Sequence, residues 1–381
     1  MNAEVIVGKG FGVGLTWSPL ELAEVKTPRR IGSIWRAKGA TSRRRIKFDD
    51  RAVCSHLMSR TVNGEFLFGP TEKEAFRRMM WRMAAFLGVE VLTYVVMDNH
   101  FHILVKVPER AKWLARFEGE EGERRLMQHL ATLYSKKFIV QLECELREFR
   151  EQGNEHAAGE LIEKFMKRFC DVSVFMKELK ERFSRWFNKQ QGRRGTLWMD
   201  RFKSVLVDGE EALATMAAYI DLNPVRAGIV EDPLEYEWSG YGEACSGSRR
   251  AKRGICKALN HSQDLWEKKT LPRYRLFLFD EGVEGDDGGN PKKAQRRGGI
   301  ARSARLQVRA ERGNLDGDLR RRVVLRKRVP AFTNGVVYGR GKFVREVAER
   351  YREAMGQERV RKPKELEDGR GRFVVREEEG C

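Results

Sequence analysis

Apolar and polar residues alternate with the period of a β-strand in several short stretches of the chain. Residues 52–62 predict a first strand, residues 89–97 are rich in β-branched and aromatic side chains, and residues 100–107 return as a strand after an Asp-Asn pair at 98–99. Since Asp-Asn is turn chemistry, we predict a hairpin over 89–107. Residues 195–207 (GTLWMDRFKSVLV) predict a further strand.

Other stretches follow the 3.6-residue period of a helix. Residues 71–87 carry apolar side chains at helical spacing, behind a Thr71 and Glu74 capping-box pattern, and Gly88 is expected to end this helix. Residues 109–190 are charged and mostly helical in pattern, with an apolar stripe that is typical of core packing (Phe175, Leu179, Phe183 and Phe187).

A second capping pattern precedes residues 210–222. Asp208 and Glu211 stand at its start, and Pro224 is expected to stop the helix. Together these stretches place a mixed set of strands and helices in the first two thirds of the chain.

The composition changes on both sides of this region. We predict a basic, flexible arm over residues 1–50, a core domain over 51–245 with a charged helical insertion at about 109–190, a basic and partly disordered linker over 246–323, and a small helical, DNA-binding region with a tail over 324–381.

Charge points to a polyanionic partner. The formal net charge is +19, and residues 246–381 hold 35 Lys and Arg against 20 Asp and Glu. The alternative is that basic tails only keep the protein soluble or bind RNA without specificity. Neither a signal peptide nor a membrane span is evident. The six cysteines form no CxxC pair, which favours a reducing compartment over disulfides or a zinc module.

Two histidines stand one residue apart in the stretch His100-Phe101-His102. On a strand both imidazoles face one side while Phe101 faces the other, so the pair could bind a metal ion. Surface or packing histidines are the alternative explanation of this spacing.

Tyr219 and Asn223 are four residues apart on the predicted helix and therefore share a face, where a phenol nucleophile and an amide oxygen could converge on one ion. Because proline disfavours helical geometry in the preceding residue, Asn223 is expected in a distorted last turn. A half-buried aromatic on an amphipathic helix is the alternative for Tyr219.

Four stretches that include these residues or lie near them resemble the HUH single-tyrosine transposases, particularly the REP-associated group. They are MDNHFHILV, GTLWMDRFKSVLV, YIDLNPVRAGIV and DPLEYEWSGY. The similarity runs from about residue 52 to 241, and VVYGRGKFVREVAERYREAMG resembles a C-terminal region of some relatives. It implies that His100 and His102 bind a divalent metal, that Tyr219 is the catalytic nucleophile, and that Asn223 completes the metal coordination.

The resemblance also implies a fold and an activity. The fold would be α+β, a ferredoxin-like antiparallel sheet with helices packed on one face. The activity would be metal-dependent cleavage and rejoining of single-stranded DNA near hairpins through a 5′-phosphotyrosine, with Mg²⁺ or Mn²⁺ as cofactor. A cytoplasmic, nucleoid-associated location is expected, and a homodimer stays open.

Further residues are candidates for contact with DNA. Arg201 and Lys203 flank Phe202 on the predicted strand and could bind phosphates, although a solvated strand face explains them equally well. Arg226 could contact DNA or cap its helix. His56 is expected to be a packing or DNA-facing residue rather than a third metal ligand.

Two rival functions remain at this point. A domesticated nucleic-acid-binding protein of the same fold would bind without turnover. A metal-dependent phosphohydrolase would use activated water, leave no covalent adduct and tolerate loss of the tyrosine.

Overall fold

The structure, a computed structural model, describes residues 46–281, 332–333, 335–355, 364–365 and 372–376. Most of the predicted N-terminal arm and the stretch 282–323 of the predicted linker lie outside these residues. The chain divides into two compact units, one of which contains residues 117–164 and the other the remaining described residues. The predicted α+β class is confirmed.

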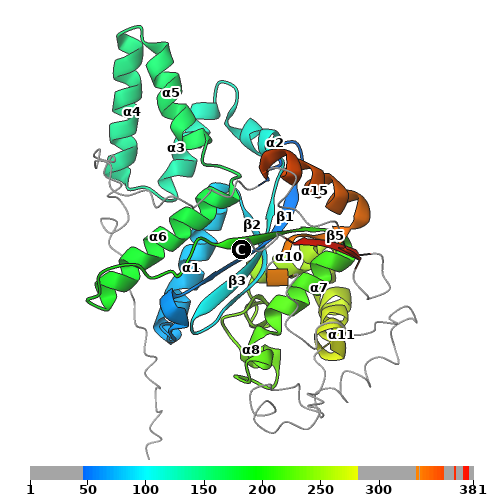
Figure 1. The fold of residues 1–381 in the computed structure, drawn as a ribbon. Helices are drawn as coiled ribbons and strands as arrows, with labels where there is room; N and C mark the ends of the chain where they lie inside the picture. Colours follow the sequence, from blue (N-terminus) through cyan, green and yellow to red (C-terminus); the bar gives the residue numbers. More distant parts are fainter. Residues whose placement is uncertain (1–45, 282–331, 334, 356–363, 366–371, 377–381) are drawn as a thin grey trace, which may run out of the picture. The chain divides into compact units, whose positions relative to one another are not determined.

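A seven-stranded sheet forms the larger unit, in the order β2-β3-β1-β4-β5-β7-β6 (Figure 1). Neighbouring strands are antiparallel except β4 and β5, which run parallel. The strands are β1 (Val53–Arg60), β2 (Glu90–Val96), β3 (His100–Val107), β4 (Lys203–Asp208), β5 (Gly335–Arg340), β6 (Lys364–Glu365) and β7 (Arg372–Arg376).

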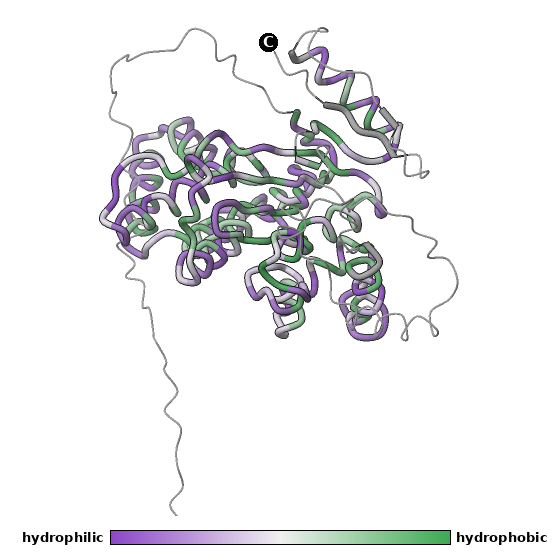
Figure 2. The backbone as a smooth tube through the Cα atoms, turned by 60° about the horizontal axis from the view of Figure 1, so that its bottom comes forward, coloured by the Kyte–Doolittle hydropathy of each residue, from purple (hydrophilic) through white to green (hydrophobic). Residues whose placement is uncertain are grey.

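The α-helices vary from one turn to five turns in length. In chain order they are α1 (Pro70–Leu87), α2 (Arg110–Leu114), α3 (Gly122–Ala131), α4 (Lys136–Glu151), α5 (Glu155–Met166), α6 (Val172–Gln190), α7 (Glu210–Asp221), α8 (Asn223–Arg226), α9 (Gly240–Cys245), α10 (Arg249–Ala258), α11 (Leu271–Glu281) and α15 (Gly341–Met355). Hydrophobic and hydrophilic positions alternate along these helices, as expected where one side packs and the other meets solvent (Figure 2).

Helices cover both faces of the sheet, not one face as the sequence predicted. On one face, Phe76 of α1 contacts Phe101 of β3 with 4.5 Å between ring centroids, and Phe183 of α6 packs against Phe76. Since side chains alternate along a strand, the histidines beside Phe101 face the opposite side, where α7 lies. The sheet is therefore a middle layer, and the histidines lie under α7.

The predicted hairpin and first helix are confirmed with small shifts. The hairpin is β2 and β3, and α1 ends at Gly88, whose φ of 69° is the left-handed conformation that glycine tolerates best. The capping residues differ from the predicted pair, because the Gly69 amide donates to the Glu72 carboxylate at 3.0 Å. The predicted strand at 195–207 is shorter and begins only at Lys203.

The structure divides the predicted insertion at 109–190 between the two units. Only residues 117–164 form a separate unit, which contains α3, α4 and most of α5. Helix α6 instead packs against α1 in the larger unit, because its apolar stripe of aromatic residues needs a buried partner surface.

The core of the larger unit continues past the predicted domain boundary at residue 246. Helices α10 and α11 lie within the stretch expected to be a linker, yet Ile255 and Tyr274 are fully buried in the same core as Tyr219. Beyond the gap, β5, α15 and β7 form a strand–helix–strand segment that extends the sheet beside β4, so the C-terminal region is not purely helical.

A buried carboxylate fixes the end of α7. Asp221 accepts hydrogen bonds from Thr93 Oγ1 of β2 at 2.9 and 3.0 Å, from Tyr274 Oη of α11 at 2.5 Å and from the Tyr241 amide of α9 at 3.2 Å. These donors tie three elements to the helix that carries Tyr219. Burial raises the pKa of Asp221 to about 7, against the opposing effect of the hydrogen bonds.

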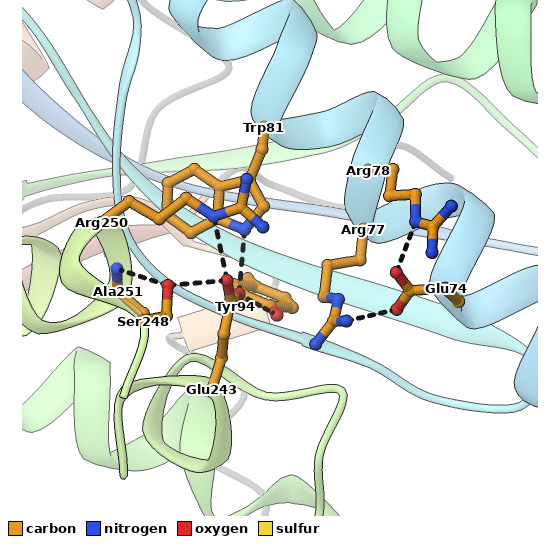
Figure 3. A network of polar contacts seen from close by, with 9 residues as sticks. All are labelled: Glu74, Arg77, Arg78, Trp81, Tyr94, Glu243, Ser248, Arg250 and Ala251. Atoms are coloured by element: carbon orange, nitrogen blue, oxygen red, sulfur yellow. Dashed lines mark hydrogen bonds and ion pairs between the residues drawn. The ribbon is translucent and has the colours of Figure 1, made fainter. Parts of the chain in front are cut away.

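A second carboxylate joins α1, β2 and the start of α10 (Figure 3). Glu243 accepts hydrogen bonds from Tyr94 Oη at 2.6 Å and from the Trp81 indole, Ser248 hydroxyl and Arg250 guanidinium, each at 2.9 Å. This network holds α9 and α10 against the edge of the sheet.

Helix α10 approaches β2 so closely that only glycine fits. A Cβ on Gly254 would lie 2.5 Å from the Leu92 carbonyl oxygen, and the backbone there has little room to move. We expect Gly254→Ala to lower the free energy of unfolding by about 1–3 kcal/mol through overpacking, as measured by urea denaturation. Gly159→Ala is the matched control, because its site in α5 is open; it should stabilise or leave stability unchanged. Equal effects of both changes would contradict this packing.

We expect the contribution of Asp221 to the free energy of unfolding to fall as the pH rises. Its pKa in the folded state is above that of an exposed carboxyl, so the stabilisation is present at low pH and is lost between about pH 4 and pH 7. Relative to Asp221→Asn, which does not titrate, the wild type should lose roughly 3 kcal/mol of unfolding free energy between pH 5 and pH 8. Parallel pH profiles for the two proteins, measured by chemical denaturation, would refute the raised pKa.

Candidate active site

The register of the sheet gathers several polar side chains on the face beneath α7. His102 of β3 pairs with Met58 of β1, which in turn pairs with Lys203 of β4, so the three side chains form one row across the sheet. Arg60 and His100 pair in the next row toward the end of the strands. His56 shares this face, two residues before Met58.

His56 and His102 are in direct contact. Nε2 of His56 lies 2.8 Å from Nδ1 of His102, and both side chains are buried. Burial lowers the pKa of His56 to about 4, and it also lowers the pKa of His102 well below the usual value, with the neighbouring His56 adding to the shift. Both imidazoles are therefore neutral at physiological pH.

His100 lies beside His102 with 5.1 Å between ring centroids and the rings nearly perpendicular. Its Nδ1 is 2.6 Å from Oδ1 of Asn99. The amide of Asn99 is oriented by a second hydrogen bond, since its Nδ2 donates to the Gly64 carbonyl at 2.8 Å. The predicted pair of neighbouring imidazoles thus exists on one strand face.

Tyr219 of α7 reaches the same place. Its ring centroid lies 6.2 Å from those of both His56 and His102, in edge-on contacts. Phe332, which precedes β5, covers the tyrosine with 5.1 Å between centroids, and the tyrosine is only 3% exposed. The backbone oxygen of Phe332 also accepts a hydrogen bond from His56 Nδ1 at 2.9 Å.

The predicted end of the helix before Pro224 is confirmed, because α7 ends at Asp221. Pro224 occupies the first turn of the short helix α8, where its missing amide costs nothing, and Leu222 lies between α7 and α8. Asn223 begins the new turn instead of sitting in a distorted last turn. Its Nδ2 donates to the carbonyls of Tyr219 and Ile220, both at 3.1 Å, which leaves its Oδ1 directed away from these carbonyls.

Arg226 is a close neighbour of the tyrosine. Its guanidinium carbon lies 4.2 Å from the centre of the Tyr219 ring, and its Nη2 donates to the Tyr219 carbonyl. Its Nη1 is buried and has no hydrogen-bond partner among the residues that the structure describes. Burial lowers the pKa of Arg226 to about 10, so it remains a cation at neutral pH.

Two neighbouring imidazoles are the side chains at this place that could bind a divalent cation. His102 is neutral and has its Nδ1 engaged by His56, so its Nε2 is the nitrogen suited to a metal. In the described part of the chain no group of three or more His, Cys, Asp or Glu side chains could hold a metal ion. A metal here would therefore need an amide or substrate oxygen besides the two imidazoles, as the prediction with Asn223 supposes.

Three basic residues were predicted to contact DNA. Arg201 and Lys203 are exposed and flank the buried Phe202, so the predicted alternation is present. Arg226 instead packs on Tyr219. Sequence reasoning missed Arg60, an exposed cation in the row of His100, because only the pairing of β1 with β3 brings these two residues together.

Comparisons with known proteins do not assign the chain to a family. No family model matches the chain, and no curated protein matches it. A solved structure of a REP-associated tyrosine transposase bound to a REP hairpin is similar over 54% of this chain and 86% of that chain, with 14% sequence identity and a TM-score of 0.33. A similarity this weak says nothing about what this chain does. No described helix is both long enough and apolar enough to cross a membrane.

Asn223 should stabilise the junction of α7 and α8. We expect Asn223→Ala to lower the free energy of unfolding by about 1 kcal/mol, because two carbonyls lose a donor. Asn223→Asp keeps the shape but places a negative charge beside the same carbonyls, so it should cost at least as much. Thermal unfolding of the three proteins tests this, and an alanine variant as stable as the wild type would contradict the contacts.

Proposed function

We propose that the protein is a metal-dependent nuclease and strand transferase of the HUH single-tyrosine type that acts on single-stranded DNA, with Tyr219 as its nucleophile. The observation that carries the proposal is the meeting of a tyrosine, two neighbouring histidines and a partly buried arginine at one place near α7. The Nη1 of Arg226 is buried without a partner among the described residues, and it can therefore still bind an oxygen of a ligand.

The strand order β2-β3-β1-β4 supports the finer fold assignment. Four antiparallel strands in this order, with α1 connecting β1 to β2 and α6 in the connection from β3 to β4, form a ferredoxin-like core. Because that core also serves proteins without catalysis, the function depends on the side chains and not on the fold.

His100 and His102 would hold a divalent metal, Mg²⁺ or Mn²⁺, with Asn223 supplying an amide oxygen. Bound there, the metal would act as a Lewis acid that polarises the scissile phosphate. Imidazole ligands favour Mn²⁺ over Mg²⁺, which prefers oxygen.

In the proposed reaction, Oη of Tyr219 attacks the scissile phosphorus. The Oη–P bond forms as the P–O3′ bond breaks, which leaves a 5′-phosphotyrosine and a free 3′-hydroxyl after protonation of the leaving oxygen. Attack by another 3′-hydroxyl reverses these bond changes and rejoins the strand without an external energy source. Cleavage and joining thus use one site.

Cations around the site would hold the DNA backbone. Arg226 carries a buried, unpaired N–H group beside Tyr219, which a phosphate oxygen would satisfy. Arg60 and Lys203 are exposed on the same face of the sheet as the histidines and could bind flanking phosphates. Single-stranded DNA with hairpins is the proposed substrate.

The decisive experiment is a search for a covalent protein–DNA adduct. Wild-type protein is incubated with a labelled library of single-stranded hairpins and Mn²⁺, and the products are separated on a denaturing gel. We expect an adduct that disappears in Tyr219→Phe and on addition of EDTA, since the phenyl ring has no nucleophile and the chelator removes the metal. Tyr134→Phe, in the unit at residues 117–164, is the control and should form the adduct as the wild type does.

Other outcomes would favour the rival functions. DNA binding without an adduct across the library would point to a non-catalytic nucleic-acid-binding protein. Metal-dependent cleavage that survives in Tyr219→Phe would point to a phosphohydrolase that uses water as its nucleophile.

A further inference from the structure

Two side chains that have no part in the proposed reaction are hydrogen-bonded to His100 and His102. His56 contacts Nδ1 of His102 at 2.8 Å, and Asn99 contacts Nδ1 of His100 at 2.6 Å. In both cases the same ring nitrogen is engaged, although the partners come from different strands and loops. This shared pattern suggests that His56 and Asn99 have the same role.

The hydrogen-bond partners of His56 determine which of its ring nitrogens carries hydrogen. A backbone carbonyl only accepts hydrogen bonds, so His56 Nδ1, at 2.9 Å from the Phe332 oxygen, carries a hydrogen. In a neutral ring its Nε2 is then an acceptor, and the hydrogen between the two rings belongs to Nδ1 of His102. The lone pair of His102 is consequently on Nε2.

The same reasoning applies to His100. Asn99 Nδ2 donates to the Gly64 carbonyl at 2.8 Å, which turns the amide oxygen toward His100. An amide oxygen accepts only, so His100 Nδ1 carries the hydrogen. In a neutral ring, its Nε2 then has the lone pair as well.

We propose that His56 and Asn99 are positioning residues that fix both His100 and His102 in the tautomer with hydrogen on Nδ1, which places the lone pair of each ring on Nε2, the nitrogen that would bind the metal. The Phe332 carbonyl orients His56 and is the origin of the relay that ends at His102. The proposal rests on the proposed function, in which these two histidines bind the metal, and it assigns roles to residues outside that metal's ligands.

The relay needs a side chain at position 56 that both donates and accepts. Gln offers both groups on one side chain, so His56→Gln should preserve the relay. Leu has a similar bulk and neither group, so His56→Leu leaves the Phe332 oxygen and His102 Nδ1 without this partner. Comparison of these two variants separates the hydrogen-bond relay from simple filling of space.

The direct test reads the tautomers by NMR. Full-length, metal-free protein is labelled with ¹⁵N-histidine, the His100 and His102 signals are assigned by substitution, and long-range ¹H–¹⁵N spectra report which ring nitrogen carries hydrogen. We expect hydrogen on Nδ1 of both histidines in the wild type and in His56→Gln. Hydrogen on Nε2 of His102 in the wild type would overturn the proposal, even if the protein forms the DNA adduct.

Metal affinity gives the second readout. Mn²⁺ binding, followed by electron paramagnetic resonance without DNA, should weaken by about 10–100-fold in His56→Leu and remain within a few-fold in His56→Gln. Wild-type affinity in a folded His56→Leu would overturn the relay. If the leucine variant does not fold, as judged by circular dichroism, the tautomers in the wild type and in His56→Gln decide the question. Absence of an adduct with the expected tautomers would count against the proposed function alone.

Discussion

The antiparallel pairing of β1 with β3 is the constraint on which the site depends. This register places His56 within hydrogen-bonding distance of His102 and sets Arg60 opposite His100. A slip of one residue would turn every side chain of one strand to the other face and separate these groups. The register is fixed because Leu57 and Ile103 must face α1 and α6 while Met58 and Leu104 must face α7.

Two buried carboxylates hold the helices over this sheet. Asp221 and Glu243 each accept hydrogen bonds from several elements. Full sets of donors offset the cost of burying these groups, and such networks favour one arrangement over looser alternatives. The hydrogen bonds to Asp221, two residues further along α7, thereby fix the position of Tyr219.

Local patterns allowed much of the fold to be predicted, but long-range contacts did not follow from them. The hairpin, α1 and the core of α7 were predicted because period, turn residues and the stop at Gly88 act over a few residues. The contact of His56 with His102 depends on strand pairing, and the cover of Phe332 comes from a distant segment. Residues 246–281 were assigned to a linker because glycine and arginine are common in linkers, whereas Gly254 here allows α10 to pack closely on β2.

The hydrogen bond between His56 and the Phe332 carbonyl also depends on the order in which the ribosome makes the chain. The two residues are 276 positions apart, whereas His56 and His102 are 46 apart. At roughly 5–20 residues per second, a ribosome needs on the order of tens of seconds to travel from the first of these residues to the last. During that time the histidines can pair while the carbonyl that orients His56 does not yet exist. Under the proposed function and relay, a chain still attached to its ribosome and messenger RNA would lack a finished metal site, so synthesis itself would delay the appearance of nuclease activity.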